Sequence, residues 1–194
     1  DFDRSANASA PFIADPALSV GDRILNAVEA TFAAVATNTN LGILLLSAPL
    51  AAAAEHCTKN ASFADSLHAV LAALNHNDAC AVYKAIAMAN PAGLGSDKVG
   101  DVRADPPADW TLLDAMRAAA PRDMIAQEYA TGFATILANA RTLTQDIASG
   151  AAPEDALAML FLRRLSDRPD THIIRKHGPA LAHRVMARAG QRET

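Results

Sequence analysis

The sequence predicts an all-α protein, a single-domain helical bundle of about eight to nine helices with no sheet. Half of the residues (51%) are apolar but only 5% are aromatic, so the apolar surface comes in small units that suit closely packed helices. Apolar residues recur every three to four positions, and no segment alternates apolar and polar residues as a strand would. The length of 194 residues favours one domain over residues 1–194.

The first predicted helix covers residues 20 to 36. Ser19 and Asp22 have the spacing of a capping box, and apolar residues then follow at helical intervals. The next helix begins at Leu41, where Asn40 is placed to accept hydrogen bonds from the first free N–H groups.

The apolar run from Leu41 to Ala54 is predicted to be a core helix. It is shorter than the ~20 residues that a membrane-spanning helix needs, so no membrane association is expected. Pro49 lies inside the run and should kink or end the helix.

Two short amphipathic helices follow. Ser62 begins one, and Asn77 and Asp78 are expected to cap another that ends at about Ala89. The segment 90–109 is rich in Pro, Gly and Asp without any period, which predicts one long loop of the kind that is often functional.

Thr111 begins the next predicted helix, and Pro121 interrupts it. After that proline, one apolar face continues for about 28 residues as far as Ile147. Gly132 lies in its middle at a cost of about 1 kcal/mol, which suggests close packing there.

The last predicted helices begin at Pro153 and Asp170. Pro153 suits a first helical turn, and Leu157, Leu160 and Phe161 are expected to point inward. Asp170 can cap a short helix that Gly178-Pro179 ends.

Charge and cysteine content exclude some partners. The net charge is −4 and the basic residues form no stripe, so no nucleic-acid partner is expected. Cys57 and Cys80 form no disulfide framework and are interpreted as small buried hydrophobic residues in a reducing cytoplasm. The remaining histidines are interpreted as isolated and without a role: His56, His68, His76 and His183.

The first polar cluster consists of Asn38, Thr39, Asn40 and Gly42. Two amides, a hydroxyl and a glycine at a helix N-terminus would let an anionic ligand approach closely. Simple helix capping is the alternative, and the residues alone favour it.

The second polar cluster lies between Asp170 and Gly178. Asp170 at the N-cap with Arg175, Lys176 and His177 in the last turn is typical of a well-formed exposed helix. The sharper hypothesis is that the cations grip a polyphosphate while Asp170 faces a sugar or a metal.

The third polar cluster consists of Arg122, Asp123, Gln127, Glu128 and Tyr129, and its spacing favours a solvated helix face over a site. No P-loop, Rossmann glycine pattern, nucleophile elbow or HExxH zinc motif is present, so the common nucleotide-binding folds are excluded.

Four segments in this order carry a resemblance: TNTNLGILLLSAPLAAA, the Gly-Leu-Gly at 93–95, RDMIAQEYATGF and DTHIIRKHG. Together they resemble the triphosphoribosyl-dephospho-CoA synthase family, and most of all its branch in methylotrophs and methanogens. The resemblance implies an all-α enzyme that joins the ribose C1 of ATP to a ribose hydroxyl of 3′-dephospho-CoA and releases adenine. It also implies a site that binds a triphosphate, with Mg²⁺, and stabilises positive charge at C1.

The resemblance assigns candidate roles. The nucleotide pocket would be lined by Asn38, Thr39, Asn40 and Gly42. Arg175 and Lys176 would bind the phosphates, and Asp170 would be the catalytic carboxylate and a candidate Mg²⁺ ligand. Arg122, Asp123 and His177 are further candidates.

The sequence also departs from the family pattern. An upstream Lys-Pro-Gly-Asn segment, a His-Asp-Met element and a downstream Ser-Ala-Asp-Leu motif are expected in the family and do not occur here. The branch leaves the acceptor open between dephospho-CoA and a related coenzyme, and the Ala-rich surfaces leave a homodimer open. Two alternatives stay: another ATP-using step in pterin or one-carbon coenzyme synthesis, and a non-catalytic helical binding protein.

Overall fold

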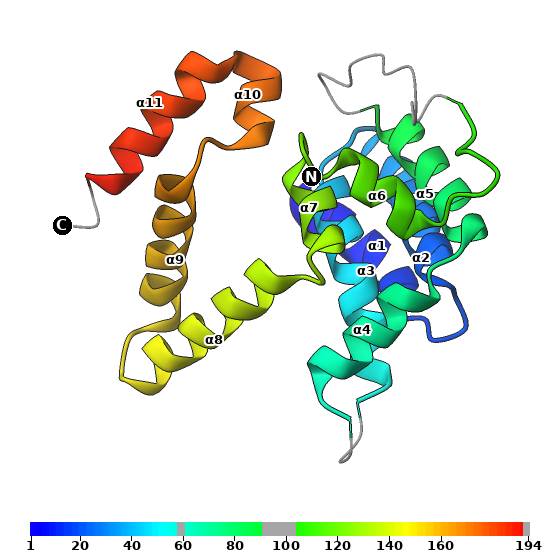
Figure 1. The fold of residues 1–194 in the computed structure, drawn as a ribbon, viewed down its shortest axis with the longest axis horizontal. Coiled ribbons are helices and arrows are strands. Elements are labelled where there is room, and N and C mark those ends of the chain that lie inside the picture. The colour runs from blue at the N-terminus through cyan, green and yellow to red at the C-terminus, as the bar shows by residue number, and fades with distance from the viewer. Residues whose placement is uncertain (58–60, 91–103, 192–194) are drawn as a thin grey trace. The chain divides into compact units, whose positions relative to one another are not determined.

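The computed structural model describes residues 1–57, 61–90 and 104–191, and these residues form α-helices and no β-strand. The all-α prediction is confirmed. Eleven helices lie in the described residues, more than predicted, because residues 2–13 and Pro179–Gly190 also form helices and one long predicted helix is two (Figure 1). Their bounds are α1 Phe2–Ile13, α2 Val20–Val35, α3 Leu41–Glu55, α4 Phe63–Ala73, α5 His76–Ala89, α6 Leu112–Ala119, α7 Met124–Ala130, α8 Ala134–Ala148, α9 Pro153–Asp167, α10 Thr171–His177 and α11 Pro179–Gly190.

Backbone contacts divide the chain into two compact units. Unit 1 consists of Asp1–Pro121 and Ile125–Gly132, and unit 2 consists of Arg122–Met124 and Phe133–Thr194. Unit 1 therefore holds α1 to α6 and most of α7, and unit 2 holds α8 to α11. The single-domain prediction stays a prediction.

α3 contributes buried residues to the core of unit 1, as the apolar run predicted. This helix is apolar on all sides, and it packs against α1, α2 and α4 (Figure 1). α5 packs against α2 and also against α6. Small residues at the contacts let these helices approach closely, as the high alanine content indicated.

Pro49 does not end α3, so this part of the prediction is wrong. The helix runs through Pro49 to Glu55. Because proline has no N–H, the carbonyl of Leu45 one turn earlier has no intrahelical donor. The buried hydroxyl of Tyr129 on α7 donates a hydrogen bond to that carbonyl, which explains why the proline is tolerated.

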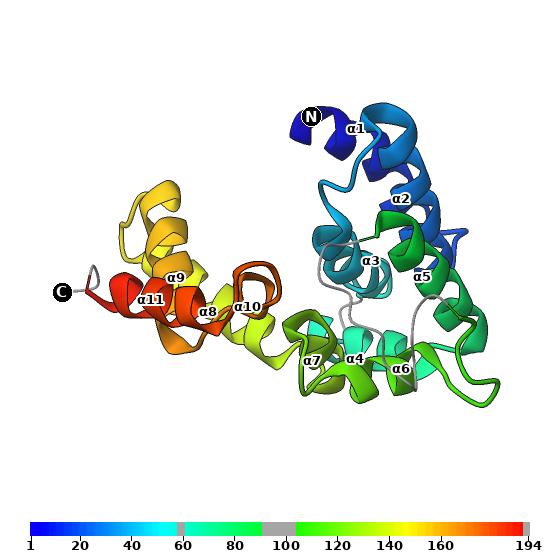
Figure 2. The ribbon, with the colours of Figure 1, turned by 90° about the horizontal axis from the view of Figure 1, so that it is seen from above.

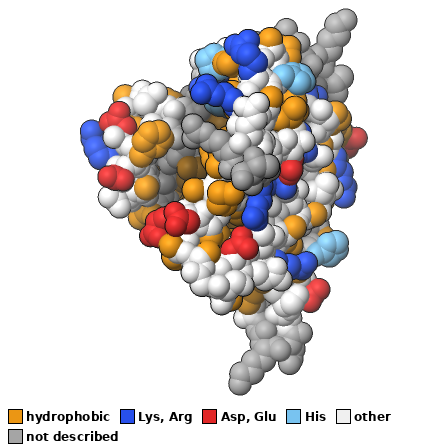
Figure 3. All heavy atoms as spheres, turned by 90° about the vertical axis from the view of Figure 1, so that its left-hand side faces the viewer, with side chains coloured by type: hydrophobic (Ala, Val, Ile, Leu, Met, Phe, Trp, Pro, Cys, Tyr) orange, Lys and Arg blue, Asp and Glu red, His pale blue; other side chains and the backbone are white. Residues whose placement is uncertain are grey.

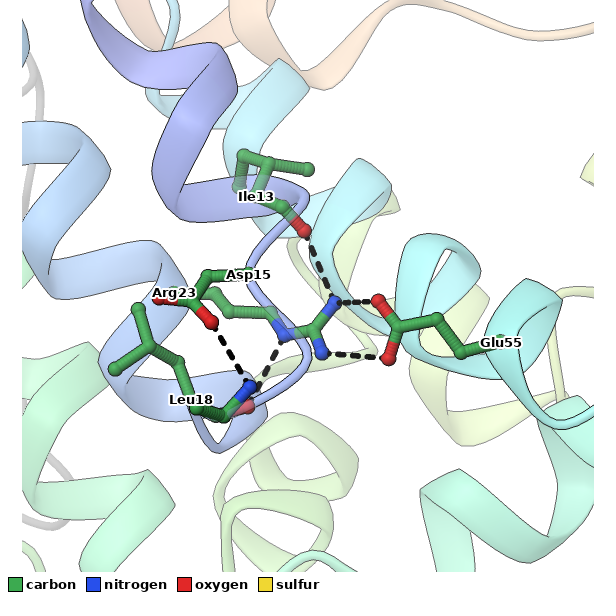
Figure 4. A network of polar contacts seen from close by, with 6 residues as sticks. Ile13, Asp15, Leu18, Arg23 and Glu55 are labelled. Atoms are coloured by element: carbon green, nitrogen blue, oxygen red, sulfur yellow. Dashed lines mark hydrogen bonds and ion pairs between the residues drawn. The ribbon is translucent and has the colours of Figure 1, made fainter.

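A buried arginine connects three parts of unit 1 (Figure 4). Arg23 on α2 is 2% exposed, and its Nη1 and Nη2 donate to the two carboxylate oxygens of Glu55 at 2.9 and 2.8 Å. It also donates to the carbonyls of Ile13 and Leu18 at 3.0 and 3.1 Å. This clamp ties the end of α1, the start of α2 and the end of α3 together.

The contact between α2 and α5 is closest at Gly21. A Cβ atom there would lie 2.5 Å from Cα of Asp78, so only glycine fits. The Gly21 N–H donates to the buried carboxylate of Asp78 at 2.8 Å. Asp78 also completes a capping box with Asn75, so the N-cap of α5 lies two residues before the predicted cap at Asn77.

The predicted starts of α2, α4 and α6 are confirmed. Ser19 accepts a hydrogen bond from the Asp22 N–H at the start of α2. Ser62 and Thr111 each form a complete capping box, at α4 and α6. Short polar side chains before an apolar run therefore marked helix starts reliably, because they supply the acceptor that a first turn lacks.

The long helix predicted from Pro121 to Ile147 is two helices. α7 ends at Ala130, and Gly132 and Phe133 both adopt left-handed backbone angles, with φ of 67° and 61°. Gly132 is thus a helix terminator rather than a packing residue inside a helix. The apolar spacing continued across the break, so periodicity alone did not reveal it.

In unit 2, α9 packs against α8 and α11, and α10 packs against α11 (Figure 2). Among the described residues, the helices of unit 2 bury three alanines: Ala156, Ala182 and Ala189. Leu157 and Phe161 are 57% and 61% exposed, so the prediction that they point inward is wrong. Ala156 is the buried residue of α9, and its small side chain allows close packing against a neighbouring helix.

None of the described helices is both long enough and apolar enough to cross a bilayer. On the face drawn in Figure 3, acidic and basic side chains are scattered with hydrophobic side chains between them.

Candidate functional site

The turn between α2 and α3 carries the first polar cluster and belongs to unit 1. The residue that caps the end of α2, Ala36, adopts a left-handed conformation with φ of 57°. The Oδ1 of Asn38 accepts a hydrogen bond at 3.2 Å from the backbone N–H of Leu41, the first residue of α3. Asn38 therefore satisfies a free N–H group of this helix, as the capping alternative expected of the cluster.

Asn40 does not cap α3, so that prediction is wrong. It is 8% exposed and makes no capping hydrogen bond. Its Oδ1 accepts from the Thr31 hydroxyl at 3.2 Å, and its Nδ2 donates to the Ser9 hydroxyl at 3.4 Å. A buried amide needs partners, and these two connect the start of α3 to α1 and α2.

Thr39 and Gly42 flank this amide. The Thr39 hydroxyl is buried and has no hydrogen-bond partner in the part of the chain that the structure describes. Leaving a buried hydroxyl unpaired costs about 1–3 kcal/mol, so this atom has unused bonding capacity. A Cβ on Gly42 would lie 3.0 Å from Cδ1 of Ile125, so the glycine makes room for a side chain from α7.

The second polar cluster forms α10 in unit 2. Oδ1 of Asp170 accepts a hydrogen bond from the Ile173 N–H at 2.9 Å, and Gly178 follows the helix, so the predicted helix and its cap are confirmed. Lys176 and His177 are exposed on its last turn. The remaining cation, Arg175, is only 26% exposed.

Arg175 is held from two sides. Its Nη1 donates to Oδ2 of Asp123 at 3.2 Å, and its Nη2 donates to Nδ1 of His172 at 3.1 Å. Because arginine has no acceptor, Nδ1 of His172 must be the unprotonated ring nitrogen. The guanidinium is therefore fixed in orientation by a carboxylate and a neutral imidazole.

The protonation state of His172 agrees with this geometry. Burial lowers the pKa of His172 below its usual value of 6.5, and the nearby charges of Lys176 and Arg175 lower it further, while Asp170 opposes them. At neutral pH the ring is uncharged and can accept the hydrogen bond from Arg175.

The third polar cluster is not a solvated face, so that interpretation is wrong. Glu128 is buried and Tyr129 is 1% exposed. Burial raises the pKa of Tyr129, and the Asp78 carboxylate raises it further, so the hydroxyl stays protonated as the donor to Leu45. Arg122 is exposed, and Asp123 is the partner of Arg175.

Sequence reasoning missed two contacts of histidine. His172 lies three residues before Arg175 on one helix, and His76 lies four residues before Cys80 on another. Both spacings put side chains on one helix face, so this was a signal in the sequence. Cys57 is exposed and Cys80 is half-buried, so the prediction that both are buried is wrong.

The structure divides the predicted site residues between the units. Unit 1 holds Asn38, Thr39, Asn40 and Gly42, and unit 2 holds Arg122, Asp123, Asp170, Arg175, Lys176 and His177. The Gly-Leu-Gly at 93–95 lies outside the described residues. Among those described, no three His, Cys, Asp or Glu residues group as metal ligands would.

Comparison with solved structures supports the fold. The chain is similar to the crystal structure of a putative triphosphoribosyl-dephospho-CoA synthase from Archaeoglobus fulgidus, with a TM-score of 0.77 and 22% sequence identity. The similarity covers 98% of this chain and 81% of the other. No curated protein matches the sequence.

Comparison with protein families covers almost the whole chain. Residues 1–193 match the CitG family, described as ATP:dephospho-CoA triphosphoribosyl transferase. The family expected from the four sequence segments is thus confirmed, and this chain belongs to the ATP:dephospho-CoA triphosphoribosyl transferase family of transferases.

Proposed function

We propose that this chain transfers the triphosphoribosyl group of ATP to 3′-dephospho-CoA, and that Arg175 is the residue that fixes the triphosphate. The family match over residues 1–193 supports the reaction. In that reaction, an acceptor hydroxyl oxygen bonds to the ribose C1 of ATP and the bond from C1 to N9 of adenine breaks. The hydroxyl proton balances the adenine, which leaves as the free base.

The ordered guanidinium of Arg175 is the observation that carries the role in phosphate binding. A long flexible side chain loses conformational entropy when it binds a ligand, and this loss is smaller when neighbours already hold it. Asp123 and His172 hold Arg175 in this way. Lys176, the next residue, adds a second positive charge for a triphosphate.

Asp170 is the proposed catalytic carboxylate. Its Oδ1 is committed to the cap of α10, which fixes the carboxylate at the start of that helix. A negative charge near the ribose would stabilise the positive charge that develops at C1 as adenine leaves.

Magnesium is part of the proposal through Asp170. Mg²⁺ is commonly bound by one or two carboxylates together with substrate phosphates and water, so one carboxylate fits without a cluster of protein ligands. The ion would supply charge neutralisation of the triphosphate. Asp170 would contribute an oxygen ligand, and Arg175 and Lys176 would bind the phosphate oxygens that remain.

The α2–α3 turn in unit 1 is also proposed to take part in nucleotide binding. Thr39 supports this proposal, because its buried hydroxyl has unused hydrogen-bonding capacity. Asn38, Asn40 and Gly42 would then act mainly by shaping the turn, since their described contacts are to the protein. Arg122 and His177 are further candidates for the phosphates.

The remaining predictions stay open to experiment. The use of ATP and the two free cysteines favour a cytoplasmic protein. The homodimer and the choice between dephospho-CoA and a related coenzyme as acceptor are also predictions.

The test is to incubate the chain with ATP, Mg²⁺ and 3′-dephospho-CoA, and to measure free adenine by chromatography and the product by mass. Arg175→Ala should lower adenine release by about a hundredfold, mostly through a higher KM for ATP, because phosphate binding is lost. Asp170→Asn should lower kcat more than it changes KM.

Arg163→Ala is the matched control. Arg163 is also in unit 2 and also pairs with an aspartate, Asp146, at 3.4 Å on an exposed surface, but no role is proposed for it. Its adenine release should equal that of the unchanged chain. Release of ADP would point to phosphoryl transfer instead, and intact ATP with no heat of binding would point to a non-catalytic protein.

A further inference from the structure

Cys80 and His76 form a thiol–imidazole pair in unit 1. Neither residue has a role in the proposed function. Both lie on the first two turns of α5. Sγ of Cys80 lies 3.3 Å from Nε2 of His76, and Nδ1 of the same ring lies 3.0 Å from the carbonyl oxygen of Trp110. All three residues are half-buried.

The carbonyl of Trp110 determines which ring nitrogen of His76 carries the proton. A carbonyl oxygen can only accept, so Nδ1 must be the donor. In the neutral ring Nε2 is then an acceptor, and the thiol of Cys80 donates to it. A nucleophile, a base within reach and a group that orients the base are the three parts of an activated nucleophile.

Cys57 provides a comparison within the same unit. It is more exposed than Cys80, but its thiol donates to the backbone carbonyl of Ala53 at 3.5 Å. A carbonyl oxygen cannot take the proton at neutral pH, so no base is hydrogen-bonded to this cysteine among the residues that the structure describes. Exposure alone favours reaction at Cys57, and the arrangement of bases favours reaction at Cys80.

We propose that Cys80 is a modification site, a reactive thiol that forms mixed disulfides with low-molecular-weight disulfides, with His76 as its base. Sγ attacks one sulfur of the small disulfide, a new S–S bond forms, and the original S–S bond breaks. The thiol proton passes to Nε2 of His76 and then to the departing thiolate. Cys80 is oxidised, and half of the small disulfide leaves as a reduced thiol.

The experiment exposes the full chain to glutathione disulfide and measures the rate of mixed-disulfide formation at Cys80 and at Cys57 by peptide mass spectrometry. His76→Asn keeps an amide near the position of Nδ1 and has no atom at the position of Nε2. It should lower the rate at Cys80 about tenfold, because the base is lost. The rate at Cys57 should stay within about twofold.

His76→Gln is the second variant, in case His76→Asn does not fold by circular dichroism. It places an amide near the position of Nε2, which accepts a hydrogen bond but does not take up a proton. It should therefore slow Cys80 as well. A decrease of about threefold or more in the folded variant supports the proposal, and a smaller change at Cys80 overturns it.

Discussion

The two units differ in how many residues they bury and of which kind. All but four of the buried apolar residues that the structure describes lie in unit 1, and so do all of the buried polar ones. The four in unit 2 are Phe133, Ala156, Ala182 and Ala189, and α8 and α10 contain no buried residue. Unit 1 should therefore carry most of the stability of the chain, because burial of apolar surface is the main favourable term in folding.

The same contrast separates two arginine–carboxylate pairs. Arg23 in unit 1 is 2% exposed, and it donates hydrogen bonds to four oxygen atoms: both carboxylate oxygens of Glu55 and the carbonyl oxygens of Ile13 and Leu18. Arg175 in unit 2 is 26% exposed, and its partners include the Asp123 carboxylate and the His172 imidazole. The two arginines therefore differ in burial, which is why a structural role is assigned to Arg23 and a ligand-binding role is proposed for Arg175.

Arg23→Ala should have the largest effect on stability. It removes the clamp, leaves Glu55 without its cation and leaves the carbonyls of Ile13 and Leu18 without a donor. Loss of one partner of a buried ion pair costs about 3–5 kcal/mol, and the partial exposure of Glu55 favours the lower end. Urea unfolding followed by circular dichroism measures this difference.

Arg175→Ala is the matched substitution in unit 2. Its ion pair with Asp123 is partly exposed, so its loss should cost less than about 1 kcal/mol. Equal losses of stability for the two variants would show that burial does not distinguish the structural Arg23 from Arg175, for which ligand binding is proposed.

Gly21→Ala should be the next most destabilising change. The new Cβ would lie 2.5 Å from Cα of Asp78, a backbone atom that cannot move without shifting α5 against α2. Overpacking of this kind costs about 1–3 kcal/mol. The measurement is again the free energy of unfolding in urea.

Gly190→Ala is its control in unit 2. A Cβ there would meet the side chain of Ser166 at an ordinary distance of 3.7 Å, and Gly190 is the last residue of α11. Alanine is favoured over glycine by about 1 kcal/mol inside a helix and by less at its end, so this variant should be unchanged or slightly more stable. A destabilisation as large as that of Gly21→Ala would mean that unit 2 is packed as tightly as unit 1.

Sequence reasoning succeeded where one local rule decided the outcome. Ser19, Ser62, Thr111 and Asp170 were predicted as caps, and each accepts a backbone hydrogen bond in the first turn of its helix. The fold class followed from composition and period in the same way. The turn at Gly132 and Phe133 was missed because the apolar spacing continues across it, although the left-handed backbone breaks the helix.

The candidate site was harder to predict, because side-chain partners come from distant parts of the chain. Asn40 was expected to cap its own helix, but Thr31 and Ser9 take up its amide. The partnership of Arg175 with Asp123 spans 52 positions, and no local spacing encodes it. The contact with His172 lies within one turn and was readable from the sequence.

Among the three substitutions expected to destabilise unit 1, the one at Tyr129 should have a smaller effect than those at Arg23 and Gly21. Tyr129→Phe removes the hydroxyl that donates to the carbonyl of Leu45, and Pro49 leaves that buried carbonyl without another donor within α3. An unsatisfied buried carbonyl costs about 1–2 kcal/mol, so the variant should lose that much stability in urea unfolding.

A double-mutant cycle with Pro49→Ala tests the reason for this loss. Alanine at 49 supplies the backbone N–H that α3 lacks, so the Leu45 carbonyl gains an intrahelical donor. In that background Tyr129→Phe should cost at least about 0.5 kcal/mol less than it does alone, since the two substitutions share one acceptor. If the two losses simply add, the hydroxyl does not replace the missing N–H, and unit 1 tolerates its internal proline for another reason.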